Sequence, residues 1–122
     1  GSIYPTKFLA DTLRGRRLVS LERAVQMMTD TPAQLFGLRD RGRVQVGHHA
    51  DLVLFDPGAI DAGPVRKVAD LPAGAERLTA SAVGIVRVLV NGSVIVADGE
   101  PTGATPGTLL RAGRDTATAP VG

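Results

Sequence analysis

The chain has 122 residues, a formal net charge of +2 and no cysteine, which excludes disulfides, thiol catalysis and thiolate metal sites. Only 3% of the residues are aromatic, so any core has to be built from aliphatic side chains. A chain of this length that folds as one unit is expected to bury roughly two-thirds of its unfolded surface.

Two helices are predicted at the start of the chain. The first spans residues 6–14, follows Tyr4-Pro5 and ends at Gly15. The second begins after Ser20, whose side chain can cap a helix N-terminus. Its apolar residues recur with helical spacing and are expected to face the core: Leu21, Ala24, Val25 and Met28.

The next stretch predicts a third, very short helix followed by two strands. Thr31 is expected to cap this helix, with Pro32 in its first position, and Gly37 is expected to end it. Residues 43–46 alternate polar and apolar side chains, which predicts a half-buried strand. After a turn at 47–50, residues 51–55 are nearly all apolar, which is typical of a strand covered on both faces.

Residues 58–82 show no period, because glycines and prolines interrupt every run. Loops of this length are uncommon within a compact domain, so the segment either wraps a neighbour or contains a strand that the pattern does not reveal. Order returns in residues 85–96, where Asn91-Gly92 predicts a hairpin with a type I′ turn, closed by Asp98-Gly99.

The C-terminal end predicts little regular structure. Thr105-Pro106 is expected to cap one last helical turn through Leu109-Leu110, and residues 112–122 have the composition of a disordered tail. Helices come first and antiparallel strands follow, so the predicted fold class is α+β.

The only two histidines, His48 and His49, are the first candidates for a metal site. Neighbouring residues of an extended segment point to opposite faces, so the two imidazoles cannot easily share one ion. Asp51 could join one histidine, but even an open zinc site normally has three protein ligands. Both histidines are therefore expected to be exposed in a turn and replaceable.

Other polar groups also lack the context of a catalytic site. No G-x-S-x-G surrounds any of the serines, which are Ser2, Ser20, Ser81 and Ser93. Asp51 and Asp56 bracket a strand ~17 Å apart, too far for a glycosidase pair, and are expected to be solvated strand ends. Asp40 is expected to form a surface charge group with its neighbours, Arg39 and Arg41.

Binding to nucleic acid or membranes is not predicted. The densest basic run comprises Arg14, Arg16 and Arg17. Without interleaved aromatic residues this run indicates a solvated helix end. No apolar run approaches the ~18 residues of a membrane span, and no signal peptide is visible, which favours a cytoplasmic location. Gly1-Ser2 resembles a tag scar, so residues are expected to precede Ile3 in the natural protein.

Two sets of residues carry a resemblance to a known family. The first set resembles the C-terminal region of amidohydrolase-superfamily enzymes, and comprises Pro32-Ala33, Gly37-Leu38, Gly42-Arg43-Val44, Gly47 and Ala50-Asp51-Leu52-Val53. The second set is similar to the N-acyl-D-amino-acid deacylase (D-aminoacylase) branch, and comprises Val90-Asn91-Gly92, Asp98-Gly99, Thr102-Gly103 and Pro106-Gly107.

The resemblance implies a parent enzyme with a zinc-dependent TIM barrel and a small β-sandwich built from both chain ends. Residues 1–37 would be the end of the barrel, residues 38–111 the C-terminal part of the sandwich, and residues 112–122 a tail. The family's metal ligands match no position here. No catalytic, cofactor-binding or metal residue is therefore predicted, and the isolated chain is expected to be inactive and free of zinc.

The partners that the resemblance implies are the upstream barrel and the N-terminal strands of the same parent chain. Without those strands, residues 88–90 and 94–97 would present open, uncharged edges, so a homo-oligomer is also expected. The alternative is a stand-alone β-rich structural or oligomerisation module without enzymatic activity.

Overall fold

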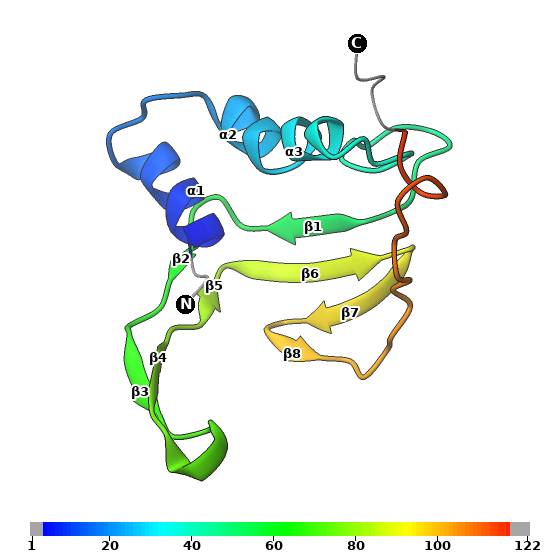
Figure 1. Cartoon of the computed structure of the whole chain (residues 1–122). Helices are drawn as coiled ribbons and strands as arrows, with labels where there is room; N and C mark the ends of the chain where they lie inside the picture. The colour runs from blue at the N-terminus through cyan, green and yellow to red at the C-terminus, as the bar shows by residue number, and fades with distance from the viewer. Residues whose placement is uncertain (1–3, 118–122) are drawn as a thin grey trace.

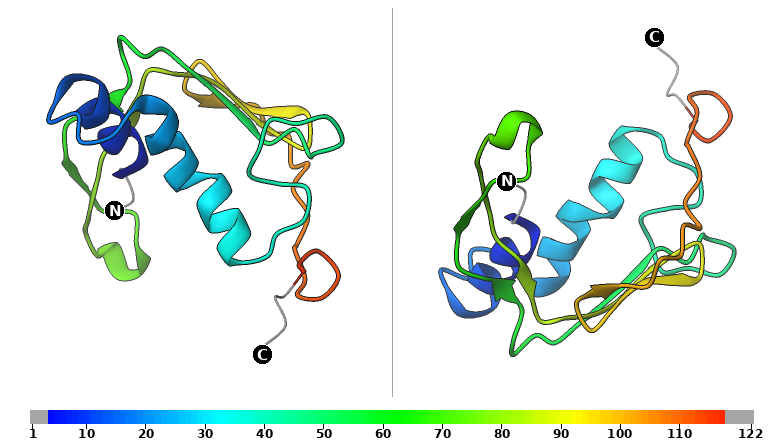
Figure 2. Two further views of the ribbon diagram at one scale, coloured as in Figure 1. Left: turned by 90° about the horizontal axis from the view of Figure 1, so that it is seen from above. Right: turned by 90° about the horizontal axis from the view of Figure 1, so that it is seen from below.

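The computed structural model describes residues 4–117 and confirms the mixed α+β class (Figure 1). The three helices are α1 (Tyr4–Arg14), α2 (Leu21–Met28) and α3 (Asp30–Leu35). A four-stranded antiparallel sheet has the order β1-β6-β7-β8, with β1 at Leu52–Phe55, β6 at Ile85–Val90, β7 at Ser93–Ala97 and β8 at Glu100–Pro101. Figure 2 shows this sheet as a layer of its own, with the helices to one side.

The first two helices form as the pattern predicts. Helix α1 begins at Tyr4, two residues earlier than expected, and still ends before Gly15. Ser20 caps α2, because its Oγ accepts a hydrogen bond of 3.1 Å from the backbone N–H of Arg23. Ala24 is fully buried, and the other predicted face residues of α2 pack around it.

Helix α3 begins earlier than predicted. Asp30 is its first residue, so Thr31 lies inside the helix and the expected cap at Thr31 is wrong. Gly37 does end the helix as predicted, with φ of +63°. The N–H of Gly37 donates to the Gln34 carbonyl and the N–H of Leu38 donates to the Ala33 carbonyl, which together make a Schellman motif.

The strand predicted at residues 43–46 is absent. Val44 and Val46 are 89% and 100% exposed, and the segment leads into a turn in which the His48 N–H donates to the Gln45 carbonyl. The half-buried strand that the alternation predicts does not form, because a strand needs a neighbour for its backbone and no segment among residues 4–117 pairs with this one.

Residues 58–82 contain short strands that the pattern did not reveal, as the second of the two sequence-based alternatives predicts. Two antiparallel ladders follow each other: β2 (Asp61–Ala62) pairs with β5 (Ala82–Val83), and β3 (Arg66–Val68) pairs with β4 (Arg77–Thr79). The 3-10 turn η1 (Pro72–Gly74) closes the tip. The ladders form an arm that extends away from the helices and the sheet in Figure 1.

The hairpin of β6 and β7 confirms the most local of the sequence signals. Asn91 and Gly92 have φ of 48° and 80°, as a type I′ turn requires. Asp98 and Gly99 repeat this conformation, with φ of 51° and 84°. They lead the chain into β8, whereas the sequence predicts that the hairpin ends at Asp98-Gly99.

The segment after β8 differs from the prediction. No helical turn forms at residues 105–110. Residues 112–115 make a turn, and Thr116 forms an isolated bridge with Leu38. Residues 118–122, the remainder of the predicted disordered tail, lie outside the described residues.

The core lies between the helices and the start of the arm. It is centred on Leu9, Ala24 and Ile60, and Ile60 is the only large side chain among the described residues that is fully buried. No residue of β1, β6, β7 or β8 is buried. The prediction that β1 is covered on both faces is therefore wrong for this chain, because Val53 and Leu54 are 53% and 52% exposed.

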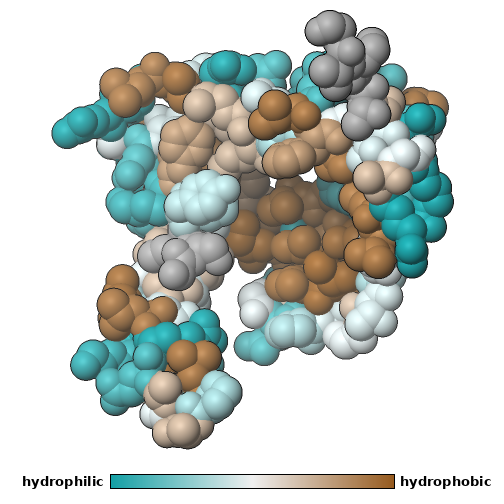
Figure 3. Space-filling view, in the orientation of Figure 1, coloured by the Kyte–Doolittle hydropathy of each residue, from teal (hydrophilic) through white to brown (hydrophobic). Residues whose placement is uncertain are grey.

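The chain exposes more surface than a compact monomer of its mass, and Figure 3 shows apolar surface gathered over the sheet below the helices. The accessible surface is 8705 Å², whereas a compact monomer of 12.7 kDa is expected to expose about 6,200 Å². The fold therefore buries only about half of the unfolded surface, less than the two-thirds expected for one closed unit. Within residues 4–117, no helix has the length and apolar character needed to cross a membrane.

Candidate functional site

The described side chains form one polar cluster at the end of the sheet where β1 begins and the β6–β7 hairpin turns. We call it the Asp51 cluster, and its members are Arg41, Asp51, Asn91 and Pro106. Asp51 Oδ1 accepts a 2.9 Å hydrogen bond from the backbone N–H of Asn91, and Oδ2 is paired with the Arg41 guanidinium. The Asn91 side chain donates from Nδ2 to the Pro106 carbonyl at 2.9 Å.

The Asp51 cluster joins three segments that are far apart in the chain. The loop before β1 supplies Arg41 and Asp51, the hairpin supplies Asn91, and the segment after β8 supplies the Pro106 carbonyl. Next to the cluster, the Gly92 N–H donates to the Ala50 carbonyl at 3.0 Å. These bonds fix the hairpin turn against the start of β1.

The electrostatics of the cluster favour an ionised Asp51. Partial burial is the largest single influence and acts to raise the pKa of the carboxyl. The Asn91 N–H and the Arg41 guanidinium act in the other direction, and together they hold the pKa of Asp51 below its usual range. Both carboxylate oxygens are engaged by protein groups, so Asp51 is not available as a metal ligand or a general base.

This geometry corrects two sequence-based interpretations. Asp51 was expected to be a solvated strand end and Arg41 part of a surface charge group with Asp40, yet the Arg41 side chain is only 13% exposed. The carbonyl of Asp40 accepts from the His49 N–H at 2.9 Å. Asp56 is also more than a solvated end, because its Oδ1 accepts from the Gly58 N–H at 2.8 Å and closes the turn after β1.

The histidines lie in the turn that the sequence predicts. His49 is exposed as expected, whereas His48 is half-buried and its Nδ1 is buried without a hydrogen-bond partner among the described groups, so the expectation of two exposed rings is wrong for His48. Within residues 4–117, no three His, Asp or Glu side chains come together in a way that could hold a metal ion.

The serines have structural partners. Ser20 caps α2, Ser93 opens β7, and the Ser81 hydroxyl accepts a 3.3 Å hydrogen bond from Arg66. Ser2 lies outside the described residues.

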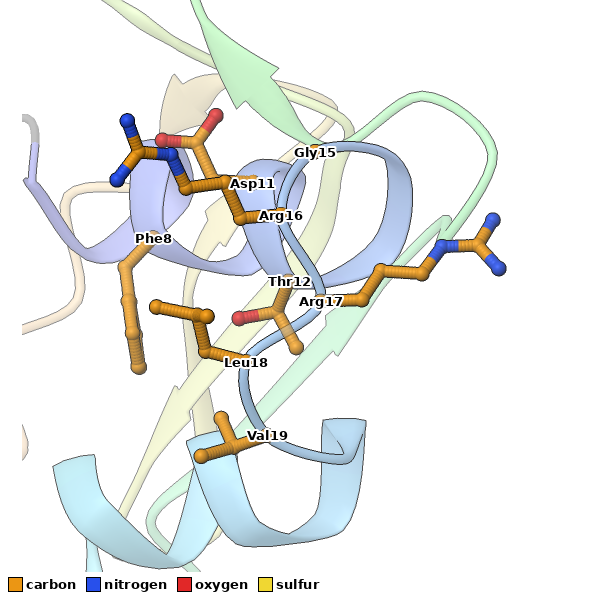
Figure 4. A pocket seen from close by; sticks show the side chains of 8 residues that line it. All are labelled: Phe8, Asp11, Thr12, Gly15, Arg16, Arg17, Leu18 and Val19. Carbon is orange, nitrogen blue, oxygen red and sulfur yellow. The ribbon is translucent and has the colours of Figure 1, made fainter.

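A shallow pocket lies beside the C-terminal end of α1. Figure 4 shows Phe8, Thr12 and Leu18 turned toward one another while the Arg17 side chain points away. The one carboxylate in its lining belongs to Asp11, which is paired with Lys7 at 2.8 Å. The pocket therefore offers an apolar floor without a reactive group.

Arg14, next to this pocket, is exposed at the helix end as expected, but its side chain also has fixed partners. Its guanidinium donates to the carbonyls of Pro57 and Ile60 and lies 3.7 Å from a carboxylate oxygen of Asp61. Arg14 thus ties α1 to the start of the arm, while Arg16 and Arg17 are exposed.

Comparison with known proteins identifies relatives of most of the chain. The Amidohydrolase family model matches residues 6–96. The chain is 39% identical over 115 residues to N-acyl-D-glutamate deacylase and 42% identical over 109 residues to N-acyl-D-aspartate deacylase, both from Alcaligenes xylosoxydans xylosoxydans. These matches cover 94% and 88% of this chain but only 22% and 20% of the relatives.

Solved structures give the same result. The crystal structure of D-aminoacylase matches with a TM-score of 0.58 and 37% identity. N-acyl-D-glutamate deacylase from Bordetella bronchiseptica, solved with zinc and a phosphonate inhibitor, matches with a TM-score of 0.57 and 40% identity. Each alignment covers 79% of this chain and 19% of the solved chain, so the chain spans about a fifth of the length of its relatives.

Proposed function

Because the chain belongs to the amidohydrolase family, we propose that it is the C-terminal, structural portion of a metal-dependent enzyme that hydrolyses amide C–N bonds. The observation that carries this proposal is the asymmetry of the matches. Relatives that are deacylases align with most of this chain, yet the chain covers about a fifth of them.

The proposed substrates of the whole enzyme are N-acyl-D-amino acids. Support comes from the names of three relatives at 39–42% identity: N-acyl-D-glutamate deacylase, N-acyl-D-aspartate deacylase and D-aminoacylase. The second set of family-like residues, around Asn91-Gly92 and Asp98-Gly99, lies in the hairpin and the turn that leads to β8.

The described residues do not fit the zinc site that the family implies. They contain two histidines, of which one is half-buried in a turn, and no group of three potential ligands. We therefore assign the metal and the catalytic groups to the rest of the proposed enzyme. Residues 1–37 would belong to the end of its barrel and residues 38–111 to its sandwich, so the open faces of the sheet would meet the rest of the enzyme.

The first test uses the 122-residue chain alone. After dialysis we expect no stoichiometric zinc by elemental analysis and no release of D-amino acid from N-acetyl-D-glutamate or N-acetyl-D-aspartate. One tightly held zinc ion per chain would overturn the structural assignment.

The second test is the reading frame upstream of Ile3. An open frame of a few hundred codons with an H-x-H motif is expected. Its full product should hydrolyse N-acetyl-D-glutamate or N-acetyl-D-aspartate faster than the L-enantiomers. A start codon next to Ile3 would instead support the alternative, a stand-alone β-rich module without activity.

A further inference from the structure

The helices and the four-stranded sheet are joined differently at the two ends of the sheet. Residues 88–90 and 94–97, which the sequence predicts as open edges, lie inside the sheet, because β6 and β7 each have a neighbour on both sides. At one end of the sheet, Phe55 and Ile85 pack against the core around Ile60. The other end is where β1 begins and the β6–β7 hairpin turns, and among the described residues it adds none to that core.

The segment that follows β8 runs along this second end. We call residues 102–117 the strap, and Figure 1 shows it passing from β8 by the hairpin turn to the end of α3. The N–H of Thr102 donates to the Ile95 carbonyl at 2.9 Å. Further on, the Pro106 carbonyl accepts the 2.9 Å hydrogen bond from Asn91 Nδ2. The near end of the strap is thus bonded to the hairpin.

The far end of the strap pairs with the residues that follow α3. The Ala117 N–H donates to the Gly37 carbonyl at 2.7 Å, and the Arg39 N–H donates to the Asp115 carbonyl at 3.0 Å. These two bonds flank the isolated antiparallel bridge. The strap therefore connects the hairpin end of the sheet to the end of α3 through hydrogen bonds.

The turn at the far end is held by groups of the strap itself. Asp115 Oδ2 accepts from the Arg111 N–H and from Arg114 Nε, each at 2.8 Å. The Gly113 N–H donates to the Thr116 hydroxyl at 2.9 Å. Because none of these bonds involves α3 or the sheet, the turn can separate from them without losing its own shape.

The strap has no apolar anchor. None of residues 102–117 is buried, and the only three that are half-buried, Pro106, Asp115 and Thr116, lie at its two points of contact. Its two leucines, Leu109 and Leu110, are 74% and 37% exposed. Segments that are held by exposed hydrogen bonds, with few buried apolar contacts, open at a lower free energy than the core does.

We therefore propose that the strap is a conformational latch that opens as one unit, independently of the Ile60 core, and that fixes the end of α3 to the hairpin end of the sheet when it is closed. When it opens, the helices and the sheet remain joined at Ile60 and through the loop before β1. In the proposed enzyme this opening would loosen the end of the barrel from the sandwich, but the inference concerns contacts within this chain and does not rest on the proposed function.

Native-state hydrogen exchange of the 122-residue chain, followed by NMR, measures this opening. The Arg39 and Ala117 amides should have equal protection factors, since both lose their acceptors when the strap opens. The Ile60 amide donates to the Asp56 carbonyl at 2.8 Å in the core, and its protection factor should be at least about tenfold larger. Unprotected Arg39 and Ala117 amides would overturn the inference, and so would a single protection factor for all three.

A substitution at the near end tests whether the strap opens as one unit. Asn91→Gly keeps the left-handed turn and its backbone N–H but removes the Nδ2 donor to Pro106. It should lower the protection factors of Arg39 and Ala117 about two- to tenfold, because the closed strap loses one hydrogen bond. The Ile60 amide should remain the most protected of the three, which shows that the core is retained.

Asp98→Gly is the matched control. Asp98 has the equivalent position in the second left-handed turn, with φ of 51°, and its hydrogen bonds go to Val86 and Arg87. This variant should leave the protection of Arg39 and Ala117 unchanged. Equal effects of the two variants, or no effect of Asn91→Gly, would show that the far end opens without the near end and would exclude a single latch.

Discussion

Asp51 is the carboxylate that does most to connect distant segments of this chain. Replacing it by asparagine should lower the free energy of unfolding by about 1.5–3 kcal/mol, because a charge-assisted pair is lost and Arg41 keeps a largely buried charge. Asp98→Asn is the control: Asp98 pairs with Arg87 at 2.7 Å, but its side chain is 76% exposed, so the loss should stay below about 1 kcal/mol. Urea denaturation at pH 7 measures both, and equal losses would contradict the special role of Asp51.

The same pair should make stability depend on pH in a defined direction. The pKa of Asp51 is lowered in the folded chain, because the hydrogen bonds from Asn91 and Arg41 outweigh the effect of burial. A lowered pKa means that the stabilisation is present above the unfolded value of about 3.9 and is lost as the pH falls through the folded value. The difference between the wild type and Asp51→Asn should therefore be full at neutral pH and shrink in acid. A difference that stayed constant down to pH 2 would exclude the ionised carboxylate as its source.

His48 offers a test of a buried nitrogen without a partner. Removing an unsatisfied polar group while keeping apolar contact is nearly neutral or stabilising, so His48→Leu should leave the free energy of unfolding unchanged or raise it. His49→Leu, at the exposed neighbour, should change it by less than about 0.5 kcal/mol. A loss above about 2 kcal/mol for His48→Leu in thermal or urea melts would show that Nδ1 has a partner in solution.

At the scale of the elements, the signals that succeeded are local ones. The Ser20 cap, the Gly37 stop and the Asn91-Gly92 turn each depend on a few consecutive residues, and all three occur in the structure. The predictions that failed concern strands, which also depend on a pairing partner elsewhere in the chain. Residues 43–46 have the right alternation but no pairing partner, while β2 and β5 pair across about twenty residues with only two residues on each side.

The stop at Gly37 has a second role that could not be read from the sequence. A Cβ at Gly37 would lie 2.3 Å from the Ala117 carbonyl oxygen, so the glycine admits the C-terminal segment as well as the left-handed turn. Gly37→Ala should therefore cost clearly more than the ~1–2 kcal/mol of a left-handed residue alone. Gly47→Ala is the matched control, with φ of +89° and open space around the position. Thermal melts should separate the two, and equal losses would show that residue 117 moves away at no cost.

At the scale of the whole molecule, the sequence identified residues of the candidate site as parts of family-like motifs but did not predict that they contact one another. Asp51 and Asn91 both belong to the family-like motifs, yet they are 40 residues apart and meet only because β1 pairs with β6. Arg41 carried no signal, because an arginine in a run that also contains Arg39, Asp40 and Arg43 is typical of a surface. Composition also could not show that the sheet, despite its valines and leucines, contains no buried residue.

The buried core lies among the helices and at Ile60, whereas the four-stranded sheet has no buried residue, and this difference leads to a last prediction. Ile60 is fully buried against Leu9 of α1 and Ala24 of α2, so it holds the helices to the start of the arm. Ile60→Ala should cost about 2–5 kcal/mol, a large part of the 5–15 kcal/mol that stabilises an ordinary domain. Leu54→Ala on β1 removes a side chain that is 52% exposed and should cost less than about 1 kcal/mol in the monomer. Urea denaturation followed by circular dichroism, at a concentration where the chain is monomeric, compares the two variants. Equal losses would mean that the sheet face at Leu54 is as well covered in solution as the helical core.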